Sequence, residues 1–186
     1  MNEADGLRTY LAGCTPLADE SVTWADGHIE LQLTTYITEA IPPTEYVTSV
    51  RCLLFREDTV LVQRDLDGMH VLPGGRREGD ESIEQTLPRE LLEETGWTID
   101  APQLLGCVHF RHLTPRPAGH VYPYPDFVPV VFLAEASRYL PERMVDDEYV
   151  VESVFRPVAE ARELALTPGQ RLLLDAALKR RTSFGE

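Results

Sequence analysis

The residues best suited to chemistry are three glutamates in the block RELLEE, residues 89–94. On a helix, residues three and four positions apart are neighbours, so Glu90, Glu93 and Glu94 project their carboxylates into one common volume. Like charges repel there, and a chain tolerates them either on a solvated face or around a cation. Carboxylate oxygens suit a hard ion such as Mg²⁺ or Mn²⁺, which takes further oxygens from substrate phosphates. The block alone leaves an exposed acidic helix and a metal site open.

The residues around this block predict a loop, a helix and a second loop. The run Pro73-Gly74-Gly75 interrupts the preceding strand and lets the backbone approach a ligand closely. Ser82 and Gln85 have the spacing of a capping box that opens a helix, and Gly96 stands where a helix ends in a left-handed residue. The helix has an apolar stripe to bury, formed by Ile83, Leu87 and Leu91.

Pro88 lies inside this predicted helix, where proline removes a backbone donor and costs about 3 kcal/mol. Two arrangements follow. Either residues 82–87 form a separate turn and Pro88 is the first residue of the helix, or a longer helix is kinked at Pro88. In both arrangements the three glutamates stay on one regular helical segment.

The stretch from Gly75 to Trp97 resembles the Nudix box, the signature of the MutT-type hydrolases. That pattern is Gly, five residues, Glu, seven residues, Arg-Glu-aliphatic, one residue, Glu-Glu, one residue, Gly and a bulky apolar residue. The sequence fills every fixed place, with Gly75, Glu81, Arg89, Glu90, Leu91, Glu93, Glu94, Gly96 and Trp97. The resemblance implies an α/β (α+β) fold, an α/β/α sandwich with a mixed β-sheet. We expect a single domain over 1–186, in which 1–45 is an N-terminal helix and strand extension.

The resemblance also implies a Mg²⁺-dependent hydrolase, with Mn²⁺ as a possible substitute. The metal neutralises phosphate charge and lowers the pKa of a bound water that attacks a diphosphate. Arg89 would orient Glu90 by a charge-assisted bond, and Glu81 would support the loop or the metal shell. The implied metal ligands are three carboxylates and one backbone carbonyl, those of Glu90, Glu93, Glu94 and Gly74.

The catalytic base and the phosphate-binding residues are less sharply defined. Glu93 is the first candidate base within the box, and Glu148 is the best later one, although its acidic surroundings also suit a solvated turn. Arg64, at the end of a strand facing the box, could hold a terminal phosphate or form an ordinary surface ion pair. Arg76 and Arg77 could meet phosphates from the loop.

Composition and charge limit the partners. The chain has 186 residues and a formal net charge of −14, which argues against coating nucleic acid or binding an anionic membrane. No stretch approaches the length of a membrane span, and residues 11–14 resemble a lipoprotein cleavage site without the apolar run before it. The cysteines are odd in number and lack metal-ligand spacing, which predicts reduced thiols in the cytoplasm for Cys14, Cys52 and Cys107.

The remaining pattern predicts the elements that position the box. Alternating or apolar runs predict strands at 28–37, 48–56, 60–64, 70–72, 104–112, 128–136 and 150–155. Helices are expected at 1–14, 157–164 and from Pro168 to about Arg181, the last burying Leu172, Leu173, Ala176 and Ala177. The N-terminal strand is a candidate dimer element, so a homodimer is one possible assembly.

Segment 113–126 is a loop rich in proline and aromatic residues, and long loops on rigid scaffolds commonly carry recognition. Tyr122, Tyr124 and Phe127 could stack on a base or a sugar, or could pack the loop onto its own domain. His70 stands where many members of the resembled family carry a tryptophan, and a lone histidine is more often structural.

The expected substrate is a small nucleotide, either a nucleoside triphosphate or a nucleotide sugar. Two classes of function stay open. The first is a hydrolase, which the intact box favours. The alternative is a module on the same fold that senses a nucleotide without turnover, and an isomerase resembling the isopentenyl diphosphate enzymes is a remote third.

Overall fold

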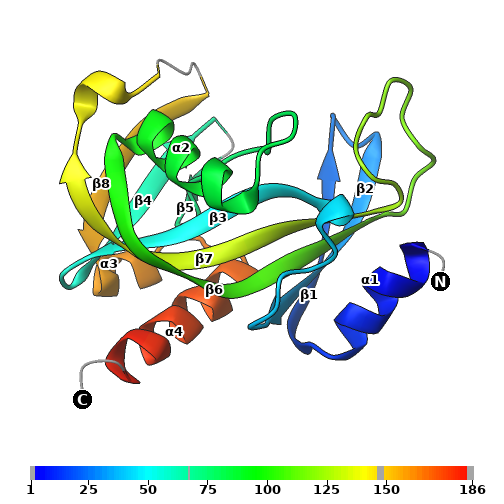
Figure 1. Cartoon of the computed structure of the whole chain (residues 1–186), viewed down its shortest axis with the longest axis horizontal. Coiled ribbons are helices and arrows are strands. Elements are labelled where there is room, and N and C mark those ends of the chain that lie inside the picture. Colours follow the sequence, from blue (N-terminus) through cyan, green and yellow to red (C-terminus); the bar gives the residue numbers. More distant parts are fainter. Residues whose placement is uncertain (1–2, 67, 146–148, 184–186) are drawn as a thin grey trace.

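A curled mixed β-sheet forms the centre of the molecule, and helices cover both of its faces (Figure 1). The computed structural model describes residues 3–66, 68–145 and 149–183. Its strands are β1 (Thr15–Trp24), β2 (Ile29–Ile37), β3 (Val47–Arg56), β4 (Thr59–Asp65), β5 (Met69–His70), β6 (Trp97–His112), β7 (Asp126–Tyr139) and β8 (Val150–Pro157). Their order is β1-β2-β6-β7-β3-β4-β5, with β8 also paired to β4. The β3–β7 pair is parallel and the other strand pairs are antiparallel, so the sheet is mixed.

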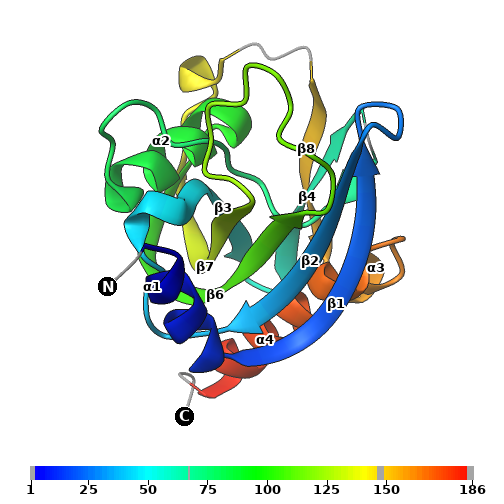
Figure 2. The same cartoon turned by 90° about the vertical axis from the view of Figure 1, so that its right-hand side faces the viewer.

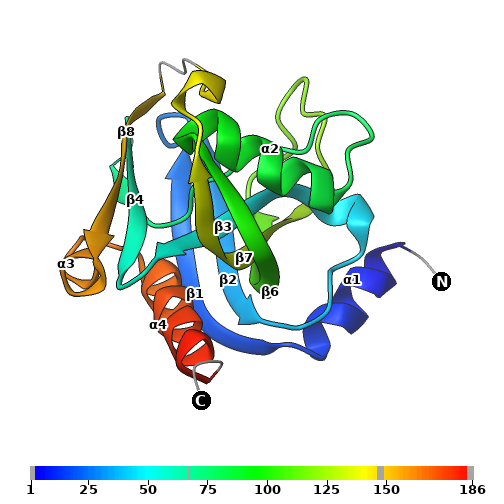
Figure 3. The same ribbon diagram turned by 60° about the vertical axis from the view of Figure 1, so that its left-hand side comes forward.

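The helices pack on opposite faces because β3 is apolar on both sides. Its residues alternate between two cores, with Val50, Cys52 and Leu54 in one and Leu53 and Phe55 in the other. Helix α2 (Ile83–Thr95) and, toward the edge, α1 (Glu3–Ala12) cover the first core. Helices α3 (Val158–Arg162) and α4 (Pro168–Ser183) cover the second (Figure 3). Short 3₁₀ turns lie at Thr44–Tyr46 and Pro141–Arg143. The expected α/β/α sandwich is confirmed.

Several elements differ from the sequence-based expectation. Strand β1 was not expected, because all of its residues are partly or fully exposed and it lacks a clear apolar alternation. Strand β6 begins at Trp97 rather than near residue 104, since the pairing of β6 with β7 shifts register around Pro102 instead of ending there. The third extended piece is limited to Met69–His70, and α3 ends at Arg162. On α4, Leu172 is exposed and Leu174 is buried in its place, beside Leu173 and Ala177.

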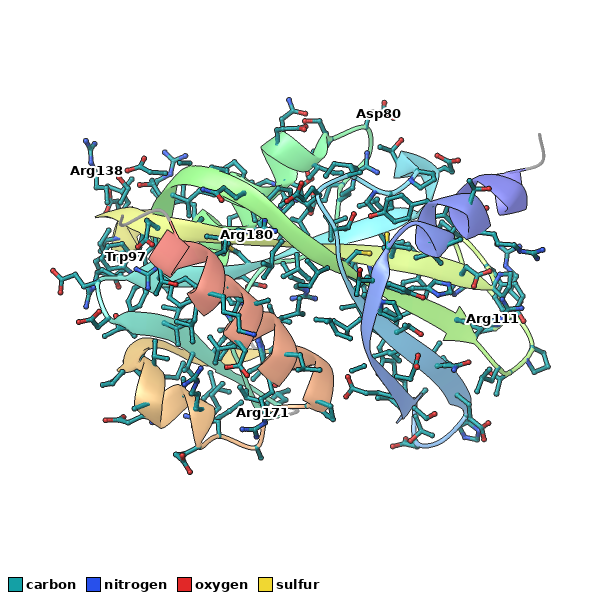
Figure 4. The ribbon with its side chains drawn as sticks, turned by 90° about the horizontal axis from the view of Figure 1, so that it is seen from below. Asp80, Trp97, Arg111, Arg138, Arg171 and Arg180 are labelled. Atoms are coloured by element: carbon teal, nitrogen blue, oxygen red, sulfur yellow. The ribbon has the colours of Figure 1, made fainter. Side chains whose placement is uncertain are left out.

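The N-terminal hairpin closes one side of the curled sheet. Strand β2 pairs with β6, so the segment before residue 45 continues the main sheet (Figure 2). Helix α4 crosses beneath the sheet, as seen from below in Figure 4. It joins the hairpin where Gly169 N donates to Glu20 Oε2 at 2.8 Å, and it joins β6 where Arg180 Nη1 donates to the carbonyl of Leu104 at 2.5 Å. Both ends of the chain therefore help to shape the space inside the curl.

Two further observations concern the cysteines and the possibility of a membrane-spanning helix. Cys14, Cys52 and Cys107 are all free thiols. None of the helices in the described ranges combines the length and the apolar character needed to cross a membrane.

Candidate active site

The loop before α2 is held in a split between two strands. Strands β3 and β4 pair with each other at their hairpin end, and beyond that point segment 73–76 lies against β3 instead. Val50 N donates to the carbonyl of Gly75 at 2.9 Å, and Cys52 N donates to the carbonyl of Pro73 at 2.9 Å. The loop is thus held by backbone hydrogen bonds of the kind that pair strands. In this position it leaves room for side chains from α2 to reach the opposite face of the sheet.

Two adjacent glycines in this loop are required for different reasons. Gly74 has φ 121°, in the region that favours glycine, and a side chain there would collide with the backbone carbonyl of Val50. Gly75 lies against the carboxylate of Glu90, where a Cβ would overlap the carboxylate oxygens. The first glycine therefore permits the loop, and the second makes room for a side chain of the box.

Helix α2 begins and ends as the sequence predicts. Ser82 and Gln85 form the capping box, and Gly96 ends the helix with φ 72°. The helix is continuous from Ile83 to Thr95 with Pro88 inside it, so the proposal of a separate turn over 82–87 is wrong. Thr86 and the predicted stripe of Ile83, Leu87 and Leu91 are buried. This packing outweighs the hydrogen bond lost at the exposed Pro88.

Arg89 is the centre of an ion-pair network on α2. Its guanidinium binds both carboxylate oxygens of Glu81, at 2.6 and 2.8 Å, and also contacts Glu93 at 2.9 Å and Glu90 at 3.0 Å. The bonds from Arg89 lower the pKa of Glu81 to about 2, and the same bonds raise the pKa of Arg89. Arg89 thus holds glutamates that are eight, four and one residue away in the sequence.

Glu94 connects the helix to the loop and to the cavity described below. Its Oε2 accepts bonds from Gly74 N at 2.9 Å and from Gln63 Nε2 at 3.3 Å. On the other side of the same glycine, Arg51 Nη1 donates to the Gly74 carbonyl. Burial lowers the pKa of Arg51, and the negative charges of Glu94 and Glu90 oppose that shift. The carbonyl expected to bind a metal therefore faces a buried cation, close to two of the expected carboxylate ligands.

The residues present fit a hard divalent ion by their chemistry. Burial raises the pKa of Glu90, Arg89 opposes this effect, and the charges of Glu94 and Glu93 add to it. The three carboxylates therefore share one electrostatic environment, and Glu90 and Glu93 are only 12% and 38% exposed. Within the described residues, their conformations do not gather three metal-binding side chains, because Arg89 and Gly74 hold them apart.

A cavity of about 490 Å³ opens beside this site, on the face of the sheet opposite α2. One end is polar and carries Arg51, Gln63 and Glu94. The other end is aromatic, with rings drawn from the hairpin, β6, β7 and loop 113–125. These aromatic wall residues are Trp24, Phe110, His112, His120, Tyr122 and Phe127. The volume is typical of a pocket for one small organic ligand.

The aromatic end is a packed arrangement of rings. Phe110 and Phe127 stack with centroids 4.8 Å apart and an interplanar angle of 19°. Trp24, 45% exposed at the tip of the hairpin, lies 5.6 Å from Phe110. The guanidinium of Arg76 lies 5.3 Å from the ring of Tyr122, so one of the predicted phosphate-binding arginines joins the cavity wall.

The structure separates the remaining predicted residues. Arg64 pairs with Glu152 at 3.7 Å on the surface, with its side chain 45% exposed, and does not line the cavity. Arg77 directs its guanidinium at the backbone carbonyls of Thr44, Val47 and Glu81, so it braces the loop. Glu148 lies outside the described residues.

The aromatic loop residues divide between the two expected roles. Tyr122 and Phe127 line the cavity, whereas Tyr124 donates its hydroxyl to the carbonyl of Thr114 at 2.9 Å and packs the loop. His70 also reaches the cavity wall, where its Nε2 lies 3.1 Å from Asp65 and burial lowers its pKa.

Sequence reasoning missed the residues that come from outside the box. Arg51 is a single polar residue within the apolar run from Val50 to Phe55, and that interruption is a signal that could have found it, whereas Gln63 only begins the polar end of its strand. His112 and Trp24 carry no comparable signal. They reach the cavity through the pairing of β6 with β2 and of β2 with β1.

Comparisons with known proteins identify the family and the fold. The family model described as NUDIX domain matches residues 45–177. YvcI, an uncharacterized Nudix hydrolase of Bacillus subtilis (strain 168), is 30% identical over 138 residues, covering 69% of this chain and 77% of the relative. The Bacillus subtilis pyrophosphohydrolase BsRppH has a TM-score of 0.56 at 17% identity, covering 89% of this chain and 98% of that chain. The NUDIX domain of Shewanella oneidensis NrtR, complexed with ADP ribose, has a TM-score of 0.55 at 21% identity, covering 97% and 99%. The two structures share the fold, and the family model and the curated relative show that the chain belongs to the Nudix hydrolase family.

Proposed function

We propose that the protein hydrolyses a diphosphate linkage in a nucleoside diphosphate derivative, such as a nucleoside triphosphate or a nucleotide sugar, with Mg²⁺. The observation that carries this proposal is the single cavity that joins the charged end at Arg51 and Glu94 to a wall of aromatic rings. Phosphates suit the first end, and a nucleoside suits the second. The likeness to a pyrophosphohydrolase and to a domain complexed with ADP ribose agrees with this choice of substrate.

The metal would be held by Glu90, Glu93, Glu94 and the Gly74 carbonyl, with Mn²⁺ as a possible substitute. A bound ion would supply charge neutralisation and a bound water of lowered pKa. Arg51 donates to the Gly74 carbonyl, and Arg89 pairs with Glu90 and Glu93, so cationic side chains offset part of the charge of this acidic cluster.

We propose that two cations hold phosphate oxygens. Arg51 is buried at the charged end of the cavity, and Arg76 lies on its wall beside Tyr122. Arg64 and Arg77 are engaged elsewhere by Glu152 and by backbone carbonyls. We therefore assign phosphate binding to the first two arginines.

The base is proposed to be Glu93. Its side chain is the most exposed of the three glutamates that pair with Arg89, which are Glu81, Glu90 and Glu93. Arg89 Nη1 contacts the Glu93 carboxylate at 2.9 Å and so orients it. Arg89 itself acts as the positioning residue for Glu90 and Glu93. Glu148 remains a proposed later base.

The same cavity also suits the alternative of a nucleotide-sensing module that binds without turnover. The intact set of carboxylates favours the hydrolase. Three further properties remain proposals. The free cysteines suggest a cytoplasmic location, and the N-terminal strand suggests a homodimer. The net charge of −14 suggests that neither a nucleic acid nor a membrane is a partner.

The decisive experiment is a nucleotide panel with Mg²⁺ or Mn²⁺, measuring phosphate and pyrophosphate release by the protein and by Glu94→Gln. We expect the variant to lose about 10²-fold or more in kcat, with an unchanged thermal transition, since the amide oxygen of glutamine still accepts the bond from Gly74 N. Glu84→Gln, on the exposed first turn of the same helix, is the matched control. Binding of nucleotides without release of either product would favour the sensing module.

A further inference from the structure

His112 is a buried polar side chain whose ring nitrogens lack a hydrogen-bond partner in the part of the chain that the structure describes. It is 7% exposed. Buried polar groups are nearly always satisfied, and an unsatisfied one costs about 1–3 kcal/mol. Gln170 Oε1 is likewise buried without a partner, and both residues belong to the cavity wall. Three of the four buried side-chain atoms without a hydrogen-bond partner in the described residues therefore lie at this cavity, and the fourth, Arg156 Nε, lies outside its lining.

The surroundings of His112 are aromatic. Its ring centroid lies 5.1 Å from that of His120, 5.2 Å from Tyr124 and 5.8 Å from Phe127. Phe127 in turn stacks on Phe110, which belongs to the same strand as His112. A flat ligand entering here would meet ring faces and a hydrogen-bonding edge together.

Burial lowers the pKa of His112, with a further contribution from His120, so the ring is neutral at pH 7. A neutral imidazole offers one donor and one acceptor. The edge of a nucleobase carries groups of the same two kinds, and base–aromatic stacking contributes to binding without requiring charge. A phosphate, in contrast, would be poorly served by a neutral ring in an aromatic pocket.

The distance between the two ends of the cavity suits a nucleotide. Arg51 is opposite Val131 on β7, and Phe110 is opposite Phe127, four residues along the same strand. Four residues of extended chain span about 13 Å. A ribose and a diphosphate can bridge that span, leaving phosphate oxygens near Arg51 and a base beside His112.

We infer that His112 is the specificity-determining residue of a nucleobase subsite, hydrogen-bonding the edge of a base that stacks on Phe110 and Phe127. This inference rests on the proposed function for the position of the diphosphate, but binding of the base itself requires no turnover. The N-terminal hairpin completes the subsite with Trp24.

The first test compares substrates with and without a base, using His112→Phe, which keeps a ring and removes both nitrogens. For a nucleoside triphosphate we expect KM to rise about tenfold with kcat little changed. For 5-phosphoribosyl diphosphate, which has a diphosphate but no base, both constants should be unchanged. His109→Phe is the matched control, because His109 lies on the same strand, binds Asp126 at 2.7 Å and does not line the cavity. Equal effects on both substrates, or no effect on either, would overturn the inference and leave the hydrolase intact.

The second test is independent of catalysis. The ring-proton NMR signals of His112, assigned by their loss in His112→Phe, are followed while a nucleoside 5′-monophosphate or ribose 5-phosphate is added without metal. We expect the first ligand to shift these signals and the second to leave them in place. An equal response to ribose 5-phosphate would mean that a sugar occupies the site, and no response to the nucleotide would exclude the base. If neither substrate class is hydrolysed, the proposed function fails while this measurement still decides the inference.

Discussion

At the residue scale, Arg89 keeps a cluster of acidic side chains in one place. Glu81 accepts two bonds from it, while Glu90 and Glu93 accept one each. A cluster of carboxylates without such a cation would repel itself, and a partly buried one would raise its own pKa values. The arginine therefore compensates the charge that makes the site useful, and Glu81 anchors the arginine.

The anchor at Glu81 predicts a specific pH dependence of stability. A carboxylate whose pKa in the folded state is lowered, here from 4.5 to about 2, contributes stability that is fully present above pH 4.5. That contribution is lost as the pH falls toward 2. Glu81→Gln should therefore lower the free energy of unfolding by about 2 kcal/mol at pH 7. The difference from the parent protein should shrink at pH 3.5, measured by urea unfolding at both pH values.

Glu78→Gln is the control for this measurement, because the side chain of Glu78 is exposed and both bonds of Glu78 to Glu81 use its backbone atoms, which the substitution keeps. A loss of stability in Glu81→Gln that has the same size at pH 7 and pH 3.5 would contradict the assignment of the ion pair.

At the element scale, the loop over 73–76 determines whether α2 can act on the cavity. It replaces β4 as the partner of β3, so the sheet has an opening at the point where Glu94 arrives. Gly74 is fixed by backbone geometry, and Gly75 by the space that the carboxylate of Glu90 needs. The two neighbouring glycines thus serve the fold and the site respectively.

This division predicts opposite effects for two neighbouring substitutions. Gly74→Ala should lower the free energy of unfolding by about 2 kcal/mol or more, because its Cβ meets backbone and its φ is 121°. Gly75→Ala should leave the thermal transition nearly unchanged, since a flexible side chain can move away, and should lower kcat about 10²-fold by displacing Glu90. Differential scanning fluorimetry and initial rates on one substrate measure both effects.

Gly6→Ala is the control for a glycine-to-alanine change as such, because a Cβ at Gly6 meets nothing within 4 Å. If Gly75→Ala kept full activity, Glu90 would not be needed in its present position.

At the scale of the whole molecule, the curl of the sheet assembles a binding wall from distant parts of the chain. Trp24 comes from the first hairpin, Phe110 and Phe127 from the two central strands, and Gln170 from the last helix. The hairpin and the last helix are joined by the bond from Gly169 to Glu20. The N-terminal extension, which is also the proposed dimer element, contributes Trp24 to the cavity of its own chain.

The two tryptophans of the chain allow this arrangement to be tested by fluorescence. Trp24 lies at the cavity, whereas Trp97 packs between Tyr139 and Phe155. In Trp97→Phe the remaining Trp24 should be quenched when a nucleoside 5′-monophosphate is added, because a stacked base lies beside it. In Trp24→Phe the remaining Trp97 should not respond. Equal quenching in both variants would show that the base binds elsewhere.

The sequence by itself determined the elements whose signals are local. The capping box at Ser82, the end of the helix at Gly96 and the apolar stripe of Ile83, Leu87 and Leu91 depend on spacings within a few turns, and each is present in the structure. The strands at 29–37, 47–56 and 59–65 follow from short apolar or alternating runs in the same way. The glutamates of the box could therefore be placed on one helix without any knowledge of the rest of the molecule.

Only the tertiary structure decided which other side chains share the site with that helix. Arg76 and Arg77 are adjacent and chemically alike, yet one lines the cavity and the other braces backbone carbonyls. Trp24 and His112 reach the cavity through strand pairings that span tens of residues. Each such choice is set by strand register and the direction of the chain, which arise from hydrogen bonds between distant segments and leave no trace in local spacing.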